Sequence, residues 1–135
     1  MADKLLLGVD IGTQGVKCSL FDSHGNCRST AFIPSQLYQP GPGITEEDPE
    51  FQVDSVCKAI NQCITSAGGI DSSSIVCMAV DGQMAGVIGI GEDGKAVTPY
   101  DSWLDTRCAP YITTMKELAE EEIIRKTGNP PSFNH

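Results

Sequence analysis

The sequence has few basic residues. Lys and Arg number nine against 18 Asp and Glu, which gives a formal net charge of −9 over 135 residues. Proteins that bind nucleic acids attract the phosphate backbone with an excess of Lys and Arg, so we expect no nucleic-acid partner. A nucleotide remains compatible with this charge, because Mg²⁺ can bridge acidic side chains and anionic phosphates.

Long apolar runs and paired cysteine motifs are also missing. The five apolar or glycine residues after residues 1–4 are too few for a signal peptide or a membrane span. The six cysteines include no Cys-x-x-Cys pair, which disfavours zinc binding. Most of them fall within apolar segments, where a free cysteine behaves as a small hydrophobic residue. We therefore expect no membrane partner and a reducing, cytoplasmic location.

What is present indicates a folded domain that begins with β-structure. Hydrophobic residues make up 40% of the chain, enough for one domain with a core. Residues 5–9 form a continuous apolar run, which predicts a central strand covered on both faces. Residues 16–21 alternate in polarity, and residues 27–33 suit a third strand after a turn at 22–26. Together they predict an antiparallel meander.

Helical signals follow an irregular Pro- and Gly-rich stretch at 34–42. Asp48 and Pro49 predict a helix start, because a carboxylate caps free N–H groups and proline fits the first turn. The apolar face of this helix is predicted to comprise Val53, Val56, Cys57, Ile60, Cys63, Ile64 and Ala67. Strands are predicted at 75–80 and 87–90, followed by a helix over 110–126. The predicted buried side of that helix comprises Tyr111, Met115, Leu118 and Ile123. The order β-β-β-α-β-β-α predicts a mixed α/β layer fold.

The stretch that follows the first strand carries the chemistry. Asp10 stands at the strand end, where a short carboxylate can reach a metal ion. Gly12 and Gly15 permit backbone conformations that turn N–H groups toward an anion, and Thr13 adds a hydroxyl donor. Lys17 supplies a compact positive charge. The alternative is a plain β-hairpin turn, since neither a Walker A loop nor a G-x-G-x-x-G motif is present. We interpret the stretch as the phosphate loop of an ATP-dependent phosphotransferase.

Two further segments make this interpretation more specific. Residues 7–17 (LGVDIGTQGVK), 81–86 (DGQMAG) and 103–107 (WLDTR) occur in an order and at a spacing that resemble the start of the FGGY carbohydrate kinases, and most closely the xylulokinase-like branch. The acidic-Pro helix start at 48–50 also matches that family. The resemblance covers essentially the whole chain, but only the first quarter to third of a full family member.

The resemblance implies an architecture. The family has an RNase H-like, actin-type ATPase fold, with two such domains and with substrate and ATP in the cleft between them. Residues 1–135 would then be the N-terminal part of the first domain, a mixed sheet with flanking helices cut from a longer two-domain enzyme. Phe133, so near the end of the chain, also suggests a sequence cut from a longer one. The missing C-terminal domain would be a partner of this chain, and a homodimer is a further option.

The resemblance also implies roles for residues near the first strand. Asp10 would help to position Mg²⁺ and the transferring phosphoryl group. Gly12, Thr13 and Gln14 would form the first phosphate loop for ATP, with Lys17 beside it.

The other two segments would bind the sugar. Gln83, Met84 and Ala85 match the segment that lines the sugar pocket. Trp103 matches an indole that packs on the sugar, and Asp105 matches a carboxylate that accepts hydroxyl hydrogen bonds. These side chains suit a sugar, which presents apolar C–H faces between its hydroxyl groups. Core packing is the alternative for Trp103, and an N-cap of the helix near residue 110 is the alternative for Asp105.

The chain departs from the family at positions that bear on the substrate. Xylulokinase-like members often carry His in place of Ala85 and Asn in place of Leu104, which puts xylulose itself in doubt. Glycerol kinase-like members have an Arg-Glu pair in place of Met84 and Ala85, which disfavours glycerol. We expect transfer of the γ-phosphate of ATP to a pentulose such as xylulose, or to a related sugar or polyol.

No catalytic residue is assigned within the chain. Transfer to a hydroxyl needs a base, which in this family is an aspartate further downstream, and the adenine site belongs to the second domain. We therefore expect the chain alone to be inactive. Two alternatives stay open: a non-catalytic sugar-binding or regulatory module of the same fold, and another actin-type ATPase such as an acetate-kinase-like or chaperone-like enzyme.

Overall fold

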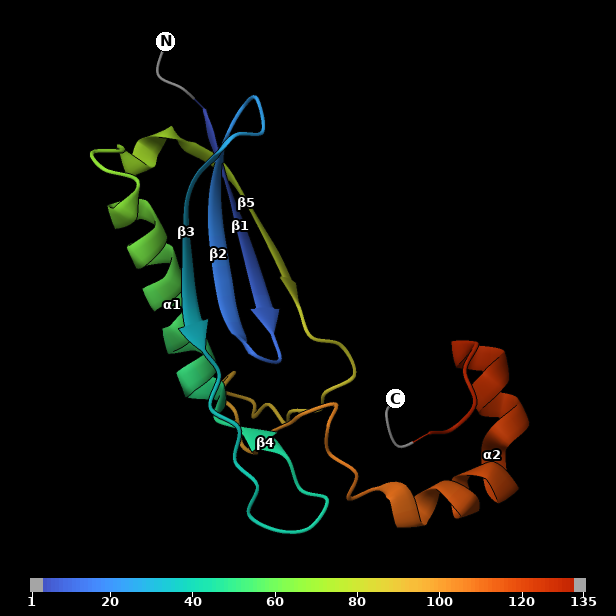
Figure 1. Cartoon of the computed structure of the whole chain (residues 1–135). Coiled ribbons are helices and arrows are strands. Elements are labelled where there is room, and N and C mark those ends of the chain that lie inside the picture. The colour runs from blue at the N-terminus through green and yellow to red at the C-terminus, as the bar shows by residue number, and fades with distance from the viewer. Residues whose placement is uncertain (1–3, 133–135) are drawn as a thin grey trace. The chain divides into compact units, whose positions relative to one another are not determined.

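A computed structural model describes residues 4–132 of the chain (Figure 1). Residues 1–3 and 133–135 lie outside the described residues. They include Phe133 and the start of the segment that is predicted to be too short for a signal peptide. The described chain divides into two compact units. The first unit comprises residues 4–36 and 48–83, and the second unit comprises residues 37–47 and 84–132.

The first unit is built on a four-stranded sheet. Its strands are β1 (Leu5–Gly12), β2 (Gly15–Asp22), β3 (Cys27–Pro34) and β5 (Ile75–Gly82), in the order β3-β2-β1-β5. The antiparallel meander of the first three strands is confirmed, and so is the turn between β2 and β3. The fourth strand, β5, runs parallel to β1, which makes the sheet mixed.

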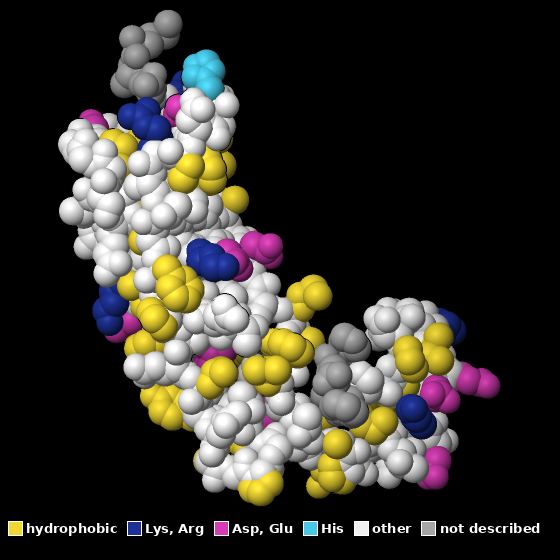
Figure 2. Space-filling view, in the orientation of Figure 1, with side chains coloured by type: hydrophobic (Ala, Val, Ile, Leu, Met, Phe, Trp, Pro, Cys, Tyr) yellow, Lys and Arg dark blue, Asp and Glu magenta, His cyan; other side chains and the backbone are white. Residues whose placement is uncertain are grey.

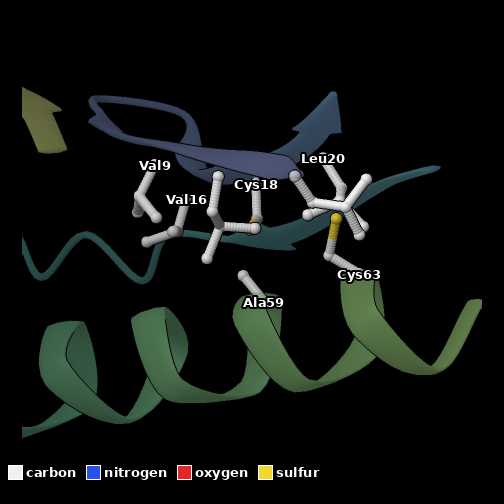
Figure 3. Packing of buried hydrophobic residues seen from close by; sticks show 8 residues of the cluster. Val9, Val16, Cys18, Leu20, Ala59 and Cys63 are labelled. Carbon is white, nitrogen blue, oxygen red and sulfur yellow. The ribbon is translucent and has the colours of Figure 1, made fainter. Parts of the chain in front are cut away.

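Helix α1 (Pro49–Ser66) covers one face of this sheet (Figure 1). The predicted start is confirmed, because the Asp48 carboxylate accepts hydrogen bonds from the backbone N–H groups of Glu50 and Phe51. The core lies between helix and strands and comprises Leu5, Leu7, Val9, Val16, Cys18, Leu20, Ala59 and Cys63. Figure 3 shows Ala59 and Cys63 of α1 directed toward the side chains of β2. Small residues on the helix let it approach the sheet closely.

Two details of the predicted core are wrong. The apolar face of α1 is narrower than predicted, since Val53 is 61% exposed and Cys57 is also exposed. The buried stripe instead runs along Ser55, Ala59 and Cys63, at a spacing of four residues. The central strand is not covered on both faces either, because α1 lies on one face only and Leu6, on the other, is 44% exposed.

The cysteines also differ from the prediction. All six are free thiols, but only Cys18 and Cys63 are buried, and the other four are exposed. Burial raises the pKa of Cys18 to about 12, and the neighbouring Cys63 thiol adds to this shift. Cys18 therefore stays protonated and packs as a small hydrophobic residue, as predicted for cysteines in apolar segments.

The second unit has little regular structure. Its strands β4 (Glu46–Glu47) and β6 (Tyr100–Asp101) pair antiparallel over two residues each. The predicted strand at 87–90 is wrong, since Val87 and Ile90 form only single bridges, to Asp101 and Ala96. Glycines interrupt this stretch at positions 86, 89 and 91, which weakens a continuous strand.

The predicted second helix is confirmed in place but not in burial. A 3-10 turn (Ala109–Tyr111) leads into α2 (Ile112–Thr127), which ends at Gly128 with a left-handed backbone. Tyr111 and Leu118, both predicted to be buried, are 68% and 80% exposed. Periodicity shows that a helix has an apolar face, but it does not show what covers that face. Neither helix of the described chain is long and apolar enough to span a membrane.

Candidate functional site

The predicted phosphate loop is a tight hairpin between β1 and β2. Gly12 pairs with Gly15, so that Thr13 and Gln14 form the turn. Gly15 has a φ of 152°, and a Cβ atom there would lie 2.7 Å from ring atoms of Phe32. Glycine is therefore required at this position, because the backbone carbonyl oxygen of Ile33 and the Phe32 ring both pack against its backbone.

Ser35, which follows β3, anchors the hairpin. Its backbone N–H donates to the Gln14 carbonyl at 3.0 Å, and its hydroxyl donates to the Gly12 carbonyl at 3.4 Å. Both ends of the turn are thus tied to the same residue. Sequence reasoning did not find Ser35, and no local signal could have, since it lies more than twenty residues from its partners in the chain.

Charged side chains lie beside the hairpin on the sheet face opposite α1. Asp10 is paired in register with Lys17 on β2 and with Asp81 on β5. Successive residues of a strand point to opposite faces, so these three side chains share the face away from the core. Figure 2 shows basic and acidic side chains next to one another over these strands. The register of the sheet thus assembles charges from three strands.

A shallow hollow adjoins this row of charges. It has a volume of about 360 Å³, and Gly8, Ser19 and Ala79 form part of its floor. Asp10, Lys17 and Asp81 also line it. Small residues on three neighbouring strands leave room above the sheet at the place where the charged side chains stand.

The donor set suits Mg²⁺. This ion keeps several waters and takes one or two protein carboxylates, and Asp10 and Asp81 supply two on neighbouring strands. Asp81 also accepts a hydrogen bond from the N–H of Gly82 at 2.8 Å. Within residues 4–132 no group of three or more His, Cys, Asp or Glu side chains could enclose a metal ion. The chemistry fits an open, partly hydrated magnesium site.

Gln83 belongs to the first unit, next to the β1–β2 hairpin. Its backbone N–H donates to the Ile11 carbonyl at 2.8 Å, and its side-chain oxygen lies 3.5 Å from the Thr13 hydroxyl. The chain then enters the second unit at Met84, whose side chain is 81% exposed. The next residue, Ala85, has a φ of 62°, a left-handed conformation that costs a non-glycine residue about 1 kcal/mol.

Trp103 lies in a turn of the second unit whose ends are buried. The N–H of Asp105 donates to the Ser102 carbonyl at 2.8 Å, which places Trp103 and Leu104 at the two central positions. These two side chains are 39% and 38% exposed, while Ser102 and Asp105 are buried. Trp103 is therefore not a core residue of the described chain.

Asp105 is the centre of a charged cluster. Its carboxylate accepts hydrogen bonds from the backbone N–H groups of Thr45 and Arg107 and two from the Arg107 guanidinium. The guanidinium also pairs with Glu46 at 2.7 Å and with Asp101 at 3.2 Å. Hydrogen bonds from Arg107, reinforced by that from Thr45, lower the pKa of Asp105 to about 2 against the cost of burial.

These contacts test the alternative role predicted for Asp105, that of a helix N-cap. The alternative that Asp105 caps the following helix is wrong, because it accepts from Arg107 two residues on and neither helical segment that follows has a side-chain cap. The sequence contained no signal for the partners Thr45 and Glu46, which lie about sixty residues upstream.

Comparison with known proteins gives a consistent result. Residues 5–134 match the model of the FGGY family of carbohydrate kinases, N-terminal domain. The chain is 32% identical over 132 residues to a glycerol kinase of Paraburkholderia phytofirmans, covering 96% of this chain and 26% of that protein. It is 30% identical over 123 residues to a xylulose kinase of Staphylococcus epidermidis, covering 91% of this chain and 25% of that protein.

The fold agrees with these matches. A gluconate kinase structure from Lactobacillus acidophilus superposes with a TM-score of 0.88 at 28% identity, over 98% of this chain and 26% of that one. The predicted RNase H-like, actin-type fold, a mixed sheet with flanking helices, is confirmed. The chain spans about a quarter of the length of the curated relatives that it matches.

Proposed function

Because the chain belongs to the FGGY family of carbohydrate kinases, of which it is the N-terminal portion, we propose that it supplies the phosphate-binding and sugar-binding residues of an ATP-dependent sugar kinase. The reaction is transfer of the γ-phosphate of ATP to a hydroxyl group of a sugar or polyol. The observation that carries the proposal is the row of Asp10, Lys17 and Asp81 beside a glycine hairpin. Residues 1–135 form the N-terminal kinase domain of a longer two-domain polypeptide.

The first unit handles phosphate. Phosphoryl transfer passes through a loose transition state, so the protein contributes mainly by positioning groups and stabilising charge. Gly12, Thr13 and Gln14 donate hydrogen bonds to phosphate oxygens from a hairpin that Ser35 holds in place. Lys17 offsets negative charge on the phosphoryl group. Asp10 would hold Mg²⁺, which would supply positive charge beside the phosphates.

The sugar side uses the segments that begin at Gln83 and Trp103. The half-exposed Trp103 indole offers a flat apolar surface for the C–H face of a sugar. As the family resemblance implies, Gln83, Met84 and Ala85 belong to a segment that lines the sugar pocket. The base that activates the sugar hydroxyl is an aspartate in the part of the polypeptide beyond this chain, so residues 1–135 alone do not turn over.

The acceptor is a pentulose such as xylulose, or a related sugar or polyol. The matched relatives carry the names glycerol kinase and xylulose kinase, which supports a small polyhydroxy acceptor without selecting one. Ala85 and Leu104 supply no polar group, so this chain leaves part of the acceptor to apolar contact. The cytoplasmic location and a homodimeric state stay predictions.

Substitution of Asp10 tests the proposal in the polypeptide that carries this domain. Asp10→Ala should lower sugar-dependent ADP release by about a hundredfold or more, because the charge-stabilising site loses its carboxylate. The matched control is Asp54→Ala, an exposed carboxylate on α1 of the same unit. ADP release is measured with ATP, Mg²⁺ and a panel of pentuloses, glycerol and gluconate. A near-normal rate in Asp10→Ala would contradict the proposal, and sugar binding without turnover in the unmodified protein would favour the non-catalytic module.

A further inference from the structure

We propose that Asp105 is a positioning residue for Trp103 and that it makes no contact with the sugar. Together with Arg107 and the backbone of Thr45, it fixes the turn at 102–105, so that the indole stands in one orientation. This inference rests on the proposed function, in which Trp103 packs on the sugar, and it replaces the direct sugar-binding role that the family resemblance implies for Asp105.

The first argument is the acceptor capacity of the carboxylate. An ionised carboxylate offers about four lone-pair sites for hydrogen bonds. Oδ2 of Asp105 already accepts three, from Thr45 N–H at 2.8 Å and from the Arg107 guanidinium at 2.9 and 2.7 Å, and Oδ1 accepts one, from Arg107 N–H at 2.9 Å. The side chain is only 7% exposed. A sugar hydroxyl at Oδ2 would have to displace one of these donors and leave it without its charge-assisted partner, and burial of the side chain shields Oδ1 from a ligand.

The second argument is that Thr45 holds both ends of the turn. Its carbonyl accepts from the N–H of Ser102 at 3.0 Å, and its N–H donates to the Asp105 carboxylate at 2.8 Å. All three of these residues are buried. Trp103 and Leu104 lie between two ends, Ser102 and Asp105, that are both hydrogen-bonded to Thr45. The orientation of their side chains therefore depends on the Asp105 side chain as well as on backbone pairing.

The third argument concerns charge. Glu46 and Asp101 lie opposite each other in the β4–β6 pair, and like charges in that position repel. Arg107 bridges both carboxylates and Asp105 at once. Oδ2 of Asp105 accepts two charge-assisted hydrogen bonds from the guanidinium and thereby keeps it beside Glu46 and Asp101. Loss of these hydrogen bonds loosens the turn and the strands that carry it.

Trp103 is the sole tryptophan of the chain, so its fluorescence reports on this turn directly. In the 135-residue chain without sugar, Asp105→Asn and Arg107→Lys should each raise acrylamide quenching of Trp103 and lower its anisotropy. The matched control is Arg125→Lys, because the Arg125 guanidinium also donates two hydrogen bonds to one carboxylate, that of Glu122, on the exposed surface of α2 in the same unit. The control should leave both signals unchanged.

Kinetics of the polypeptide that carries this domain give the second readout. Asp105→Asn should raise the KM for sugar about tenfold, as expected for a misplaced contact, while kcat and the KM for ATP change little. If Asp105→Asn does not fold, Arg107→Lys tests whether the cluster positions Trp103, with Arg125→Lys as its control. Lysine keeps the positive charge but lacks the planar guanidinium that donates two hydrogen bonds to Asp105.

Two results would overturn the inference. An unchanged Trp103 signal with a raised sugar KM would show that Asp105 contacts the sugar itself. Unchanged fluorescence and kinetics in both cluster variants would show that the cluster does not position the indole. If the unmodified polypeptide shows no sugar-dependent turnover, the proposed function fails, whereas the fluorescence comparison still decides whether Asp105 orients Trp103.

Discussion

The two units of this chain hold their candidate functional residues by different means. In the first unit, Asp10, Lys17 and Asp81 come together because three strands share one register above a packed core. In the second unit, Trp103 is held by a turn that is tied down by one carboxylate and one guanidinium. A site built on backbone pairing keeps its geometry when one of its own side chains changes, whereas a site built on a charged cluster depends on each charge and on pH.

The largest effect is expected from the core of the first unit. Leu20→Ala should lower the free energy of unfolding by about 2–5 kcal/mol, because Leu20 is fully buried and its truncation leaves a cavity. Denaturant unfolding followed by circular dichroism measures the loss. Leu6→Ala, on the opposite sheet face and 44% exposed, is the matched control and should cost much less. Equal losses would contradict the one-sided core.

The charged cluster of the second unit should lose nearly as much stability when one of its charges is removed. Arg107→Ala should destabilise the turn by about 2 kcal/mol, an estimate already lowered because the guanidinium is 38% exposed. Faster hydrogen exchange of the Thr45 amide, which donates to Asp105, would report the loss. Arg125→Ala in the exposed pair on α2 should leave that amide unchanged. If protection of Thr45 survives in Arg107→Ala, backbone pairing alone holds the turn.

Low pH should affect the second unit more than the first. The folded-state pKa of Asp105 is lowered to about 2, below its ordinary value of 3.8, so its stabilising effect is complete above pH 4 and is lost as the pH falls toward 2. Burial raises the pKa of Asp101, which therefore protonates earlier and relieves its repulsion of Glu46, an effect of opposite sign. We expect Trp103 fluorescence in the native protein to change around pH 2, where the Asp105 carboxylate protonates. Asp105→Asn should remove this transition, and a transition that persists in that variant would assign it to another group.

The smallest effect on stability is expected at Ala85, where the chain enters the second unit after β5. Ala85→Gly should leave stability unchanged or raise it by up to about 1 kcal/mol, because glycine relieves the left-handed strain but adds freedom to the unfolded chain. Thermal unfolding measures the difference. Ala119→Gly, in the middle of α2, should instead destabilise, since glycine is a poor helix former. Destabilisation of equal size in both variants would argue against strain at Ala85.

Local signals predicted the elements well and their surroundings poorly. Asp48 marked the start of α1, and the alternation over 16–21 marked β2, because caps and periodicity are properties of a few neighbouring residues. The same reasoning placed Leu118 in a core and a strand at 87–90, and both predictions were wrong. Burial and strand pairing depend on partners that lie elsewhere in the chain, and a local pattern does not identify them.

The sequence by itself determined the family, the order of β1, β2, β3, α1 and β5, and the residue types of the predicted phosphate loop, because these follow from short motifs with a fixed spacing. Only the tertiary structure decided what surrounds each of those residues. It set Asp81 beside Asp10, and it brought Thr45 across sixty positions to the carboxylate of Asp105. The physical reason is that hydrogen-bond partners far apart in the chain are selected by the packing of whole elements. A motif identifies the carboxylate, whereas the fold determines which hydrogen bonds its oxygens already accept.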